Sequence, residues 1–152
     1  MSDHAIELRQ AQPSDATRLR SWMCAFNAVE GITVDPRAHA QALDRLLREP
    51  ALGRVWIAER EGEGIGYAVA TFNFDLEHPG LDAFLTELYV VPPWRRQGIG
   101  RQLLAAVEQQ LRALDVVALH LAVRADNPPA LALYEAAGYE PWPRRVLGKR
   151  LG

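Results

Sequence analysis

The chain has 152 residues, of which nearly half are apolar and about a quarter are charged, so it has the composition of an ordinary globular protein rather than a disordered one. This length fits one domain around one hydrophobic core, and we expect a single domain over residues 1–152. The formal charge of −2 offers no overall attraction to nucleic acid or to an anionic membrane, and the single cysteine, Cys24, excludes an intrachain disulfide and a CxxC metal clip.

The first half of the chain predicts one strand, two helices and a hairpin. Leu19, Trp22 and Met23 follow one another at helical spacing and form one apolar stripe. Pro36 stands at an early helical position, where its missing N–H group costs no hydrogen bond. In chain order the elements are a strand over 5–10, a helix that opens at 13–15, a second helix that opens at 35–36, and two hairpin strands over 54–60 and 65–74.

The second half predicts strands that alternate with helices. Pro92 stops a strong apolar strand, and Gly138 is well placed as the left-handed residue that ends a helix. In order we expect a loop over 75–82, a strand over 83–91, a helix from Gly98 to Leu114, a strand over 116–123, a helix from Asn127 to Gly138, and irregular strand over 139–151. Such an order predicts a mixed sheet with helices packed on it.

The turn between the strand 83–91 and the following helix carries the chemistry. The first N–H groups of a helix have no partner within the helix, and the helix dipole adds partial positive charge there, so a diphosphate is a natural ligand. Gly98 and Gly100 would let the backbone approach the phosphates closely. Arg95 and Arg96 would add charge-assisted contacts.

Other phosphate-binding motifs fit this turn less well. A Walker loop needs Gly-Lys-Ser/Thr, whereas Gly100 is followed by Arg101. A dinucleotide fingerprint needs a third small residue where this chain has Leu103. A pair of glycines by itself fits a strand-to-helix turn without any ligand.

Two motifs resemble those of one enzyme family. Arg95-Arg96-Gln97-Gly98-Ile99-Gly100, behind the strand Glu87 to Val91, resembles motif A of the GNAT acetyltransferases, Arg/Gln-x-x-Gly-x-Gly/Ala. The segment from Asn127 to Tyr139 resembles the family's Asn…Tyr-x-x-x-Gly-Phe/Tyr segment, one helix and one strand further on. The resemblance implies the α/β (α+β) GNAT acyl-CoA N-acyltransferase fold, with a mixed central sheet of about six to seven strands and about four helices.

The resemblance also implies a site for acetyl-CoA, and no metal. The motif A strand would part from the next strand, and the pantetheine arm would pair with backbone groups in the gap. The cofactor-binding residues implied are Leu88, Tyr89 and Val90 for this arm, Arg95, Arg96, Gln97, Gly98, Ile99, Gly100 and Arg101 for the pyrophosphate, and Asn127 and Ala130 beside the pantetheine.

Two residues are expected to move protons. By the resemblance, Tyr134 matches the family's general acid, although its position would also suit an aromatic residue of the core. Glu87 is a carboxylate in an apolar strand, where burial would raise its pKa and make it a base. The alternatives for Glu87 are a solvated strand face, an arginine partner, or a site in which water chains replace it.

The acceptor is expected to be an amine of a small molecule or of a protein, and its charge is suggested by acidic residues. There is no lysine or arginine from Asp75 to Glu87, so the acceptor groove would attract a cation such as a polyamine, an aminoglycoside or a lysine side chain. Phe72, Phe74 and Phe84 would supply an apolar wall. The acidic residues concerned are Glu30, Asp35, Asp75, Glu77, Asp82 and Glu87.

Three further expectations complete the prediction. No apolar run approaches the roughly 20 residues that cross a bilayer, and Met1 to Gln10 lack the apolar stretch of a signal peptide, which favours the cytoplasm. The family resemblance suggests a homodimer.

Alternatives to an acetyltransferase are a catalytically silent acyl-CoA-binding module, acting as a sensor or partner domain, and an enzyme that uses a different acyl-CoA. The histidines that lack metal-ligand spacing are His4, His39, His78 and His120.

Overall fold

The computed structural model describes residues 5–152, so His4 lies outside the described part. The chain divides into two compact units, residues 1–122 and 123–152, and the expected single domain stays a prediction. The first unit holds β1 (Glu7–Gln10), α1 (Ala16–Glu30), α2 (Pro36–Arg48), β2 (Gly53–Arg60), β3 (Glu63–Asp75), β4 (Gly80–Val90), α3 (Ile99–Ala113) and β5 (Ala118–Leu121). The second unit holds α4 (Pro128–Ala136).

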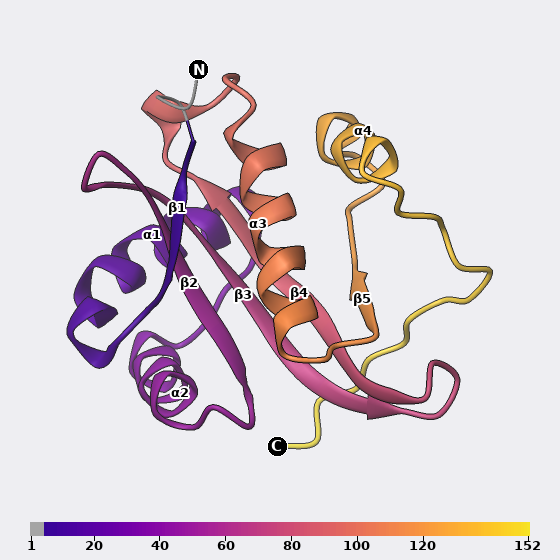
Figure 1. Cartoon of the computed structure of the whole chain (residues 1–152). Coiled ribbons are helices and arrows are strands. Elements are labelled where there is room, and N and C mark those ends of the chain that lie inside the picture. The colour runs from indigo at the N-terminus through magenta and orange to yellow at the C-terminus, as the bar shows by residue number, and fades with distance from the viewer. Residues whose placement is uncertain (1–4) are drawn as a thin grey trace. The chain divides into compact units, whose positions relative to one another are not determined.

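The five strands of the first unit form one sheet in the order β1-β2-β3-β4-β5. Strands β1 to β4 run antiparallel, whereas β5 lies parallel to β4. A parallel pair needs a crossover connection, and α3 supplies it, as Figure 1 shows. The mixed sheet is confirmed, with five strands rather than the six to seven expected.

Helices cover both faces of this sheet (Figure 1). The pair α1 and α2 packs on the face that presents Tyr67 and Val69 of β3, while Leu19 and Leu43 come from the helices. Helix α3 lies on the opposite face and buries its apolar stripe, Ile99, Leu103, Leu104, Val107 and Leu111. The helical spacing of both stripes, evident in the sequence, determines which side of each helix meets the sheet.

Half of the predicted loop over 75–82 is strand. Asp75 pairs with Gly80 and Asn73 with Asp82, so β3 and β4 continue to a tight turn at residues 76–79. Burial along β4 extends back to Asp82, which is buried next to the buried Ala83. Pro79-Gly80 therefore marks the end of a turn rather than the middle of a long loop.

The last predicted strand is wrong. Within the described residues, no strand follows α4, and residues 139–151 are irregular. Pro141 and Pro143 lack the N–H groups that a sheet ladder needs, and both lie in this segment. Gly138 has a φ of 94°, which confirms that it is the left-handed residue after α4.

Candidate active site

Strand β4 parts from β5 at a β-bulge. Val69 pairs with Glu87 but Ala70 pairs with Leu85, so Thr86 is an extra residue on β4. A bulge bends its strand and increases the local twist. The pairing with β5 ends at the same point, because its last pair is Leu85 with Leu121. In the part of the chain that the structure describes, residues 86–90 of β4 therefore pair with no strand on the β5 side.

The backbone groups of two residues face this open edge. The N–H of Val91 donates to the carbonyl of Ile65 at 2.9 Å, so Val91 faces β3. Because successive strand residues point their backbone groups to opposite edges, those of Val90 and Leu88 face away from β3. Those of Tyr89 face β3, so this residue has no backbone group for a ligand in the gap.

Arg95 already occupies part of the open edge. Its Nε donates to the carbonyl oxygen of Val90 at 2.8 Å. Its guanidinium group lies 5.3 Å from the centre of the Tyr89 ring. The Arg95 side chain therefore occupies the Val90 carbonyl oxygen, a hydrogen-bond acceptor that a strand-like ligand would otherwise use.

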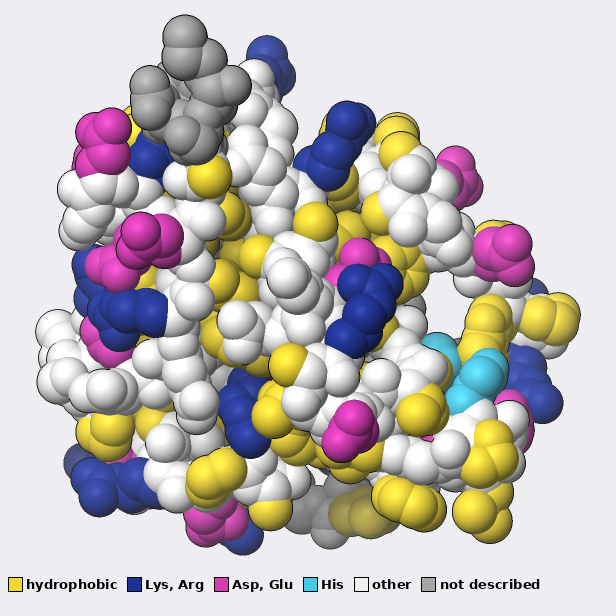
Figure 2. Space-filling model, viewed as in Figure 1, with side chains coloured by type: hydrophobic (Ala, Val, Ile, Leu, Met, Phe, Trp, Pro, Cys, Tyr) yellow, Lys and Arg dark blue, Asp and Glu magenta, His cyan; other side chains and the backbone are white. Residues whose placement is uncertain are grey.

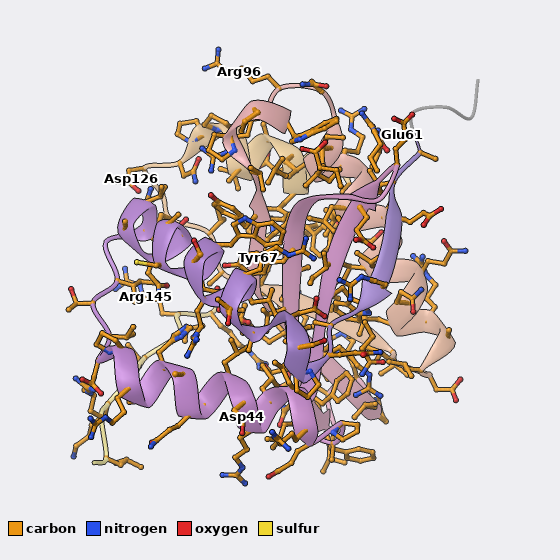
Figure 3. All side chains as sticks on the ribbon, turned by 90° about the vertical axis from the view of Figure 1, so that its left-hand side faces the viewer. Asp44, Glu61, Tyr67, Arg96, Asp126 and Arg145 are labelled. Carbon is orange, nitrogen blue, oxygen red and sulfur yellow. The ribbon has the colours of Figure 1, made fainter. Side chains whose placement is uncertain are left out.

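The turn before α3 has the backbone shape of an anion site. Arg96 and Gly98 have φ values of 62° and 75°, and both are exposed. Left-handed residues next to right-handed ones turn successive N–H groups into a concave nest that binds anions. The first bond within the helix runs from Gln102 N–H to the carbonyl of Gly98, so the N–H groups of residues 99–101 have no acceptor within the helix. Figure 3 shows the Arg96 side chain extending away from the sheet.

Glu87 lies on the face of β4 that is turned toward α1 and α2. The Tyr67 Oη donates to the Glu87 Oε1 at 2.7 Å. Burial raises the pKa of Glu87 above its ordinary value, while the Tyr67 hydrogen bond and the charge of His39 oppose the rise. The side chain therefore holds its proton more tightly than an exposed glutamate does.

Tyr67 is a rigid partner for this carboxylate. It is fully buried, and its ring stacks on Trp22 at 6.3 Å and packs against Tyr89 at 5.4 Å. Burial, reinforced by the neighbouring Glu87, raises the pKa of Tyr67 far above its usual range, so its hydroxyl stays a donor. Figure 3 shows Tyr67 between the helix pair and the sheet.

Glu87 forms part of the wall of a pocket of about 200 Å³ between the helix pair and the sheet. Among its lining residues, only Glu87 and His39 are ionisable, and the others are apolar. The lining residues are Met23, His39, Ala42, Leu43, Leu46, Val69 and Glu87. The pocket thus offers an apolar space with one carboxyl group at the strand and one imidazole on α2.

The other predicted carboxylates are not gathered around this pocket. Asp35 caps α2 by accepting from the N–H of Ala38, and Asp75 accepts from backbone N–H groups in its own turn. Asp82 lies five residues before Glu87 on an extended strand, about 17 Å away. Of the six acidic residues expected in an acceptor groove, Glu87 alone lines the pocket.

Asp82 forms a separate pair with a histidine. Its Oδ1 lies 2.8 Å from the His120 Nδ1, and Asp82 is buried. The His78 ring meets the His120 ring edge-on at 5.7 Å, and histidine side chains lie together in Figure 2. The pair joins β4 to β5 just before the two strands part.

The predicted residues of the second unit lie together on α4. Asn127 caps the helix, since its Oδ1 accepts from the Ala130 N–H at 3.3 Å. Tyr134 is half-buried, and its ring meets that of Tyr139 edge-on at 5.9 Å. Asn127, Ala130 and Tyr134 thus lie within two turns of one another, as the sequence motif predicts.

Two residues of the site have no signal in the sequence motifs. The sequence pattern indicates only that Tyr67 is an apolar residue of a strand. Its hydrogen bond to Glu87 depends on the pairing register of β3 and β4. The sequence pattern indicates only that His39 lies on one face of the helix α2. Only the packing of α2 over the sheet brings it to the wall of the pocket.

Neither a metal site nor a membrane-spanning helix is found among residues 5–152. No group of three or more His, Cys, Asp or Glu side chains in this range could hold a metal ion. No helix in the range is long and apolar enough to cross a membrane.

Comparison with known proteins gives consistent matches. The family model for the acetyltransferase (GNAT) family matches residues 17–139. Aminoglycoside N(6')-acetyltransferase type 1 of Stenotrophomonas maltophilia is 32% identical over an alignment of 152 residues, which covers 93% of this chain and 91% of that protein. A solved integron cassette protein from the mobile metagenome of Cole Harbour salt marsh is 32% identical with a TM-score of 0.82, covering 95% of this chain and 90% of its own.

A further solved structure shares the fold and contains coenzyme A. Aminoglycoside N-acetyltransferase AAC(6')-Iy in complex with CoA has a TM-score of 0.78 at 20% identity, covering 97% of this chain and 95% of its own. Because the family model spans most of the chain, the chain belongs to the GNAT acetyltransferase family. Its activity is acetyl-CoA-dependent N-acetyl transfer.

Proposed function

We propose that this chain transfers the acetyl group of acetyl-CoA directly to a primary amine, with coenzyme A at the open edge of β4 and the amine in the pocket beside Glu87. The observation that carries the proposal is the bulge at Thr86. It ends the pairing of β4 with β5, and the next residue is a half-buried carboxyl group bonded to a buried tyrosine.

The residues present fit coenzyme A. A pantetheine arm carries amide groups, and these would pair with the backbone groups of Leu88 and Val90 as a short strand would. Arg95 would then release the Val90 carbonyl and turn toward the phosphates. The N–H groups from Arg96 to Arg101 would hold the pyrophosphate. By the family motif, Asn127 and Ala130 would lie beside the pantetheine.

The reaction moves one acetyl group and one proton. The amine nitrogen attacks the thioester carbonyl carbon, the carbon–sulfur bond breaks, and the sulfur keeps the electron pair. Glu87 would accept the proton that the amine loses, directly or through a water, because a raised pKa makes its carboxylate a stronger base. Tyr134 would give a proton to the departing thiolate. A backbone N–H at the open edge of β4, near Val90, would stabilise the oxyanion.

Several finer expectations rest on the family and on the sequence. A cationic acceptor is supported by Glu87 in the pocket wall and by the aminoglycoside acetyltransferase relative, whereas the other acidic residues are engaged elsewhere. The family resemblance supports a homodimer. The single cysteine supports a cytoplasmic location. Light scattering of the purified protein tests the homodimer, which would have twice the 16.9 kDa of one chain.

The alternatives are a silent acyl-CoA-binding module and an enzyme for another acyl group. The buried hydrogen bond between Tyr67 and Glu87 favours an enzyme, since a module that only binds coenzyme A has no need of a base on the acceptor side. A thermal-shift panel of CoA esters separates the acyl groups. Release of free thiol in the presence of amines then separates an enzyme from a sensor.

The decisive experiment measures amine-dependent thiol release from acetyl-CoA by the wild-type protein and by Glu87→Gln. General base catalysis contributes about 10²–10⁴-fold, so kcat/KM for the amine should fall by about 10²-fold or more. Glu61→Gln makes the same change on an exposed turn and should keep the wild-type rate. Full activity in Glu87→Gln, with chemistry shown to be rate-limiting, would refute the role of Glu87.

A further inference from the structure

The acceptor pocket has too few polar groups for a polycationic molecule. Glu87 is its only carboxyl group, and His39 is the only other ionisable residue in its lining. An ammonium group buried without a partner costs far more than an apolar group does. A molecule with several ammonium groups would therefore place one of them beside Glu87 and leave the rest against the side chains of Leu43, Leu46 and Val69.

The connection that leads into α2 exposes aliphatic side chains. His39 stands near the beginning of α2, which follows the connection from α1. This connection and the last turn of α1 expose three aliphatic side chains: Val29 is 61% exposed, Ile32 47% and Val34 44%.

None of the other five acidic residues expected in an acceptor groove lines the pocket. Asp35 is engaged at the N-terminus of α2. Asp82 is bonded to His120 at the far part of β4. The charge that the sequence assigned to an acceptor groove is thus reduced in the structure to one carboxyl group.

We propose that the natural acceptor carries a single primary amine on an apolar arm, with the nitrogen beside Glu87 and the arm against Met23, Leu43 and Leu46. This inference rests on the proposed acetyl transfer and deepens it by naming the class of acceptor. The size of the arm follows from the pocket. A cavity of about 150 Å³ accommodates a benzene ring, so about 200 Å³ accommodates a phenyl group or an aliphatic chain of similar length.

The test compares kcat/KM for acetyl transfer among propylamine, hexylamine, 2-phenylethylamine, spermidine and kanamycin at one pH and one salt concentration. Burial of each added methylene should raise kcat/KM by about fourfold until the pocket is filled. Hexylamine and 2-phenylethylamine should therefore exceed propylamine, and both should exceed spermidine and kanamycin.

A variant of the pocket wall tests the location of the arm. Leu46→Gln places an amide group against the arm, so the ratio of kcat/KM for hexylamine to kcat/KM for propylamine should fall toward one. Leu76→Gln makes the same change in an exposed turn, where Leu76 is 80% exposed, and should leave the whole series unchanged. The wild-type series alone decides the proposal if Leu46→Gln fails to fold.

Each result has a distinct meaning. If spermidine or kanamycin is the best acceptor, the apolar-arm inference is refuted and the acetyltransferase proposal stands. If no chain-length effect appears among the monoamines, the arm does not enter the pocket and the inference is again refuted. If no amine releases thiol although acetyl-CoA binds by calorimetry, the proposed function itself fails.

Discussion

The protonation of Glu87 is set by its three nearest influences. Burial between the sheet and the helix pair favours the neutral carboxyl group and raises its pKa. The Tyr67 hydroxyl and the charge of His39 favour the carboxylate and oppose the rise. The balance leaves the pKa above the ordinary value, closer to the pH at which a general base is most effective.

Tyr67→Phe should move the activity to higher pH. The substitution removes the hydroxyl that stabilises the Glu87 carboxylate but keeps the ring that packs on Trp22. The pKa of Glu87 should rise further, so the acid limb of the kcat/KM profile should shift upward. The measurement is kcat/KM from about pH 5 to about pH 9. If the limb keeps its wild-type position while only the rate falls, Tyr67 contributes packing alone.

Tyr134→Phe should lower turnover more than acetyl-CoA affinity. The ring stays and the proton donor is lost, so kcat should fall toward about 10²-fold, the low end for general acid catalysis, because a thiolate leaves fairly well unaided. Tyr139→Phe removes a hydroxyl from the neighbouring ring and serves as the control. Equal rates for the wild type and Tyr134→Phe, with chemistry limiting, would assign Tyr134 to packing.

At the scale of elements, the turn that begins α3 is expected to bind phosphate through its backbone. Gly98 has a φ of 75°, and a Cβ added there would meet no atom within 4 Å. A side chain at this position therefore leaves the protein's own packing intact, although the left-handed backbone is strained for residues other than glycine. Binding and folding can thus be perturbed separately at this position.

Gly98→Asp should weaken acetyl-CoA binding by at least about tenfold, since a carboxylate would stand where the phosphates are expected. Gly98→Asn introduces a side chain of similar size without the charge and should lose less affinity. Gly62→Asp adds the same residue at another exposed left-handed glycine, in the hairpin turn, and should bind normally. Calorimetry of the three variants makes the comparison. Wild-type affinity in Gly98→Asp would exclude this turn as the diphosphate site.

We expect the hydrogen bond between Asp82 and His120 to help attach β5 to β4. Asp82→Ala should lower the free energy of unfolding by about 1–3 kcal/mol, because it leaves His120 without its carboxylate partner. Asp44→Ala breaks only an exposed pair with Arg48 and should cost less than about 0.5 kcal/mol. Urea midpoints measure both, and hydrogen exchange should show β5 opening first in Asp82→Ala. Equal midpoints for the two variants would mean that the pair does not hold β5.

At the scale of the whole molecule, the buried base costs stability. The folded protein holds the Glu87 proton more tightly than the unfolded chain does. Between the two pKa values the unfolded chain therefore binds fewer protons, so the free energy of unfolding falls as pH rises through this window. This loss of stability would accompany the role of base that we propose for Glu87.

Glu87→Gln should remove this decrease in the free energy of unfolding with rising pH. Relative to the wild type, the variant should gain stability as pH rises from about 4 to about 8, by about 1.4 kcal/mol for each unit of pKa shift. Comparing the stability difference at the two pH values cancels any effect of the amide on packing. A difference that is the same at both pH values would show that Glu87 has an ordinary pKa in the folded protein.

The family and most of the element order followed from the sequence because their signals are local. The apolar stripe of α3, the prolines around the turn and the motif from Arg95 to Gly100 all lie within short segments. The last strand, over 139–151, was predicted wrongly because its apolar residues resemble those of a strand. That prediction did not consider whether the backbone could form hydrogen bonds with a neighbouring strand. Pro141 and Pro143 withhold the donors that pairing requires.

The amino-acid sequence by itself thus determined the family, the type of sheet and the turn expected to hold a diphosphate. The tertiary structure alone decided the polar character of the pocket beside Glu87. Tyr67 and Glu87 are 20 residues apart and meet only through the register of β3 and β4. Asp82 and Glu87 look like parts of one acidic cluster in the sequence, yet they stand five residues apart on an extended strand that rises about 3.4 Å per residue. A local signal survives in the sequence, whereas a contact between distant segments exists only after the chain has folded.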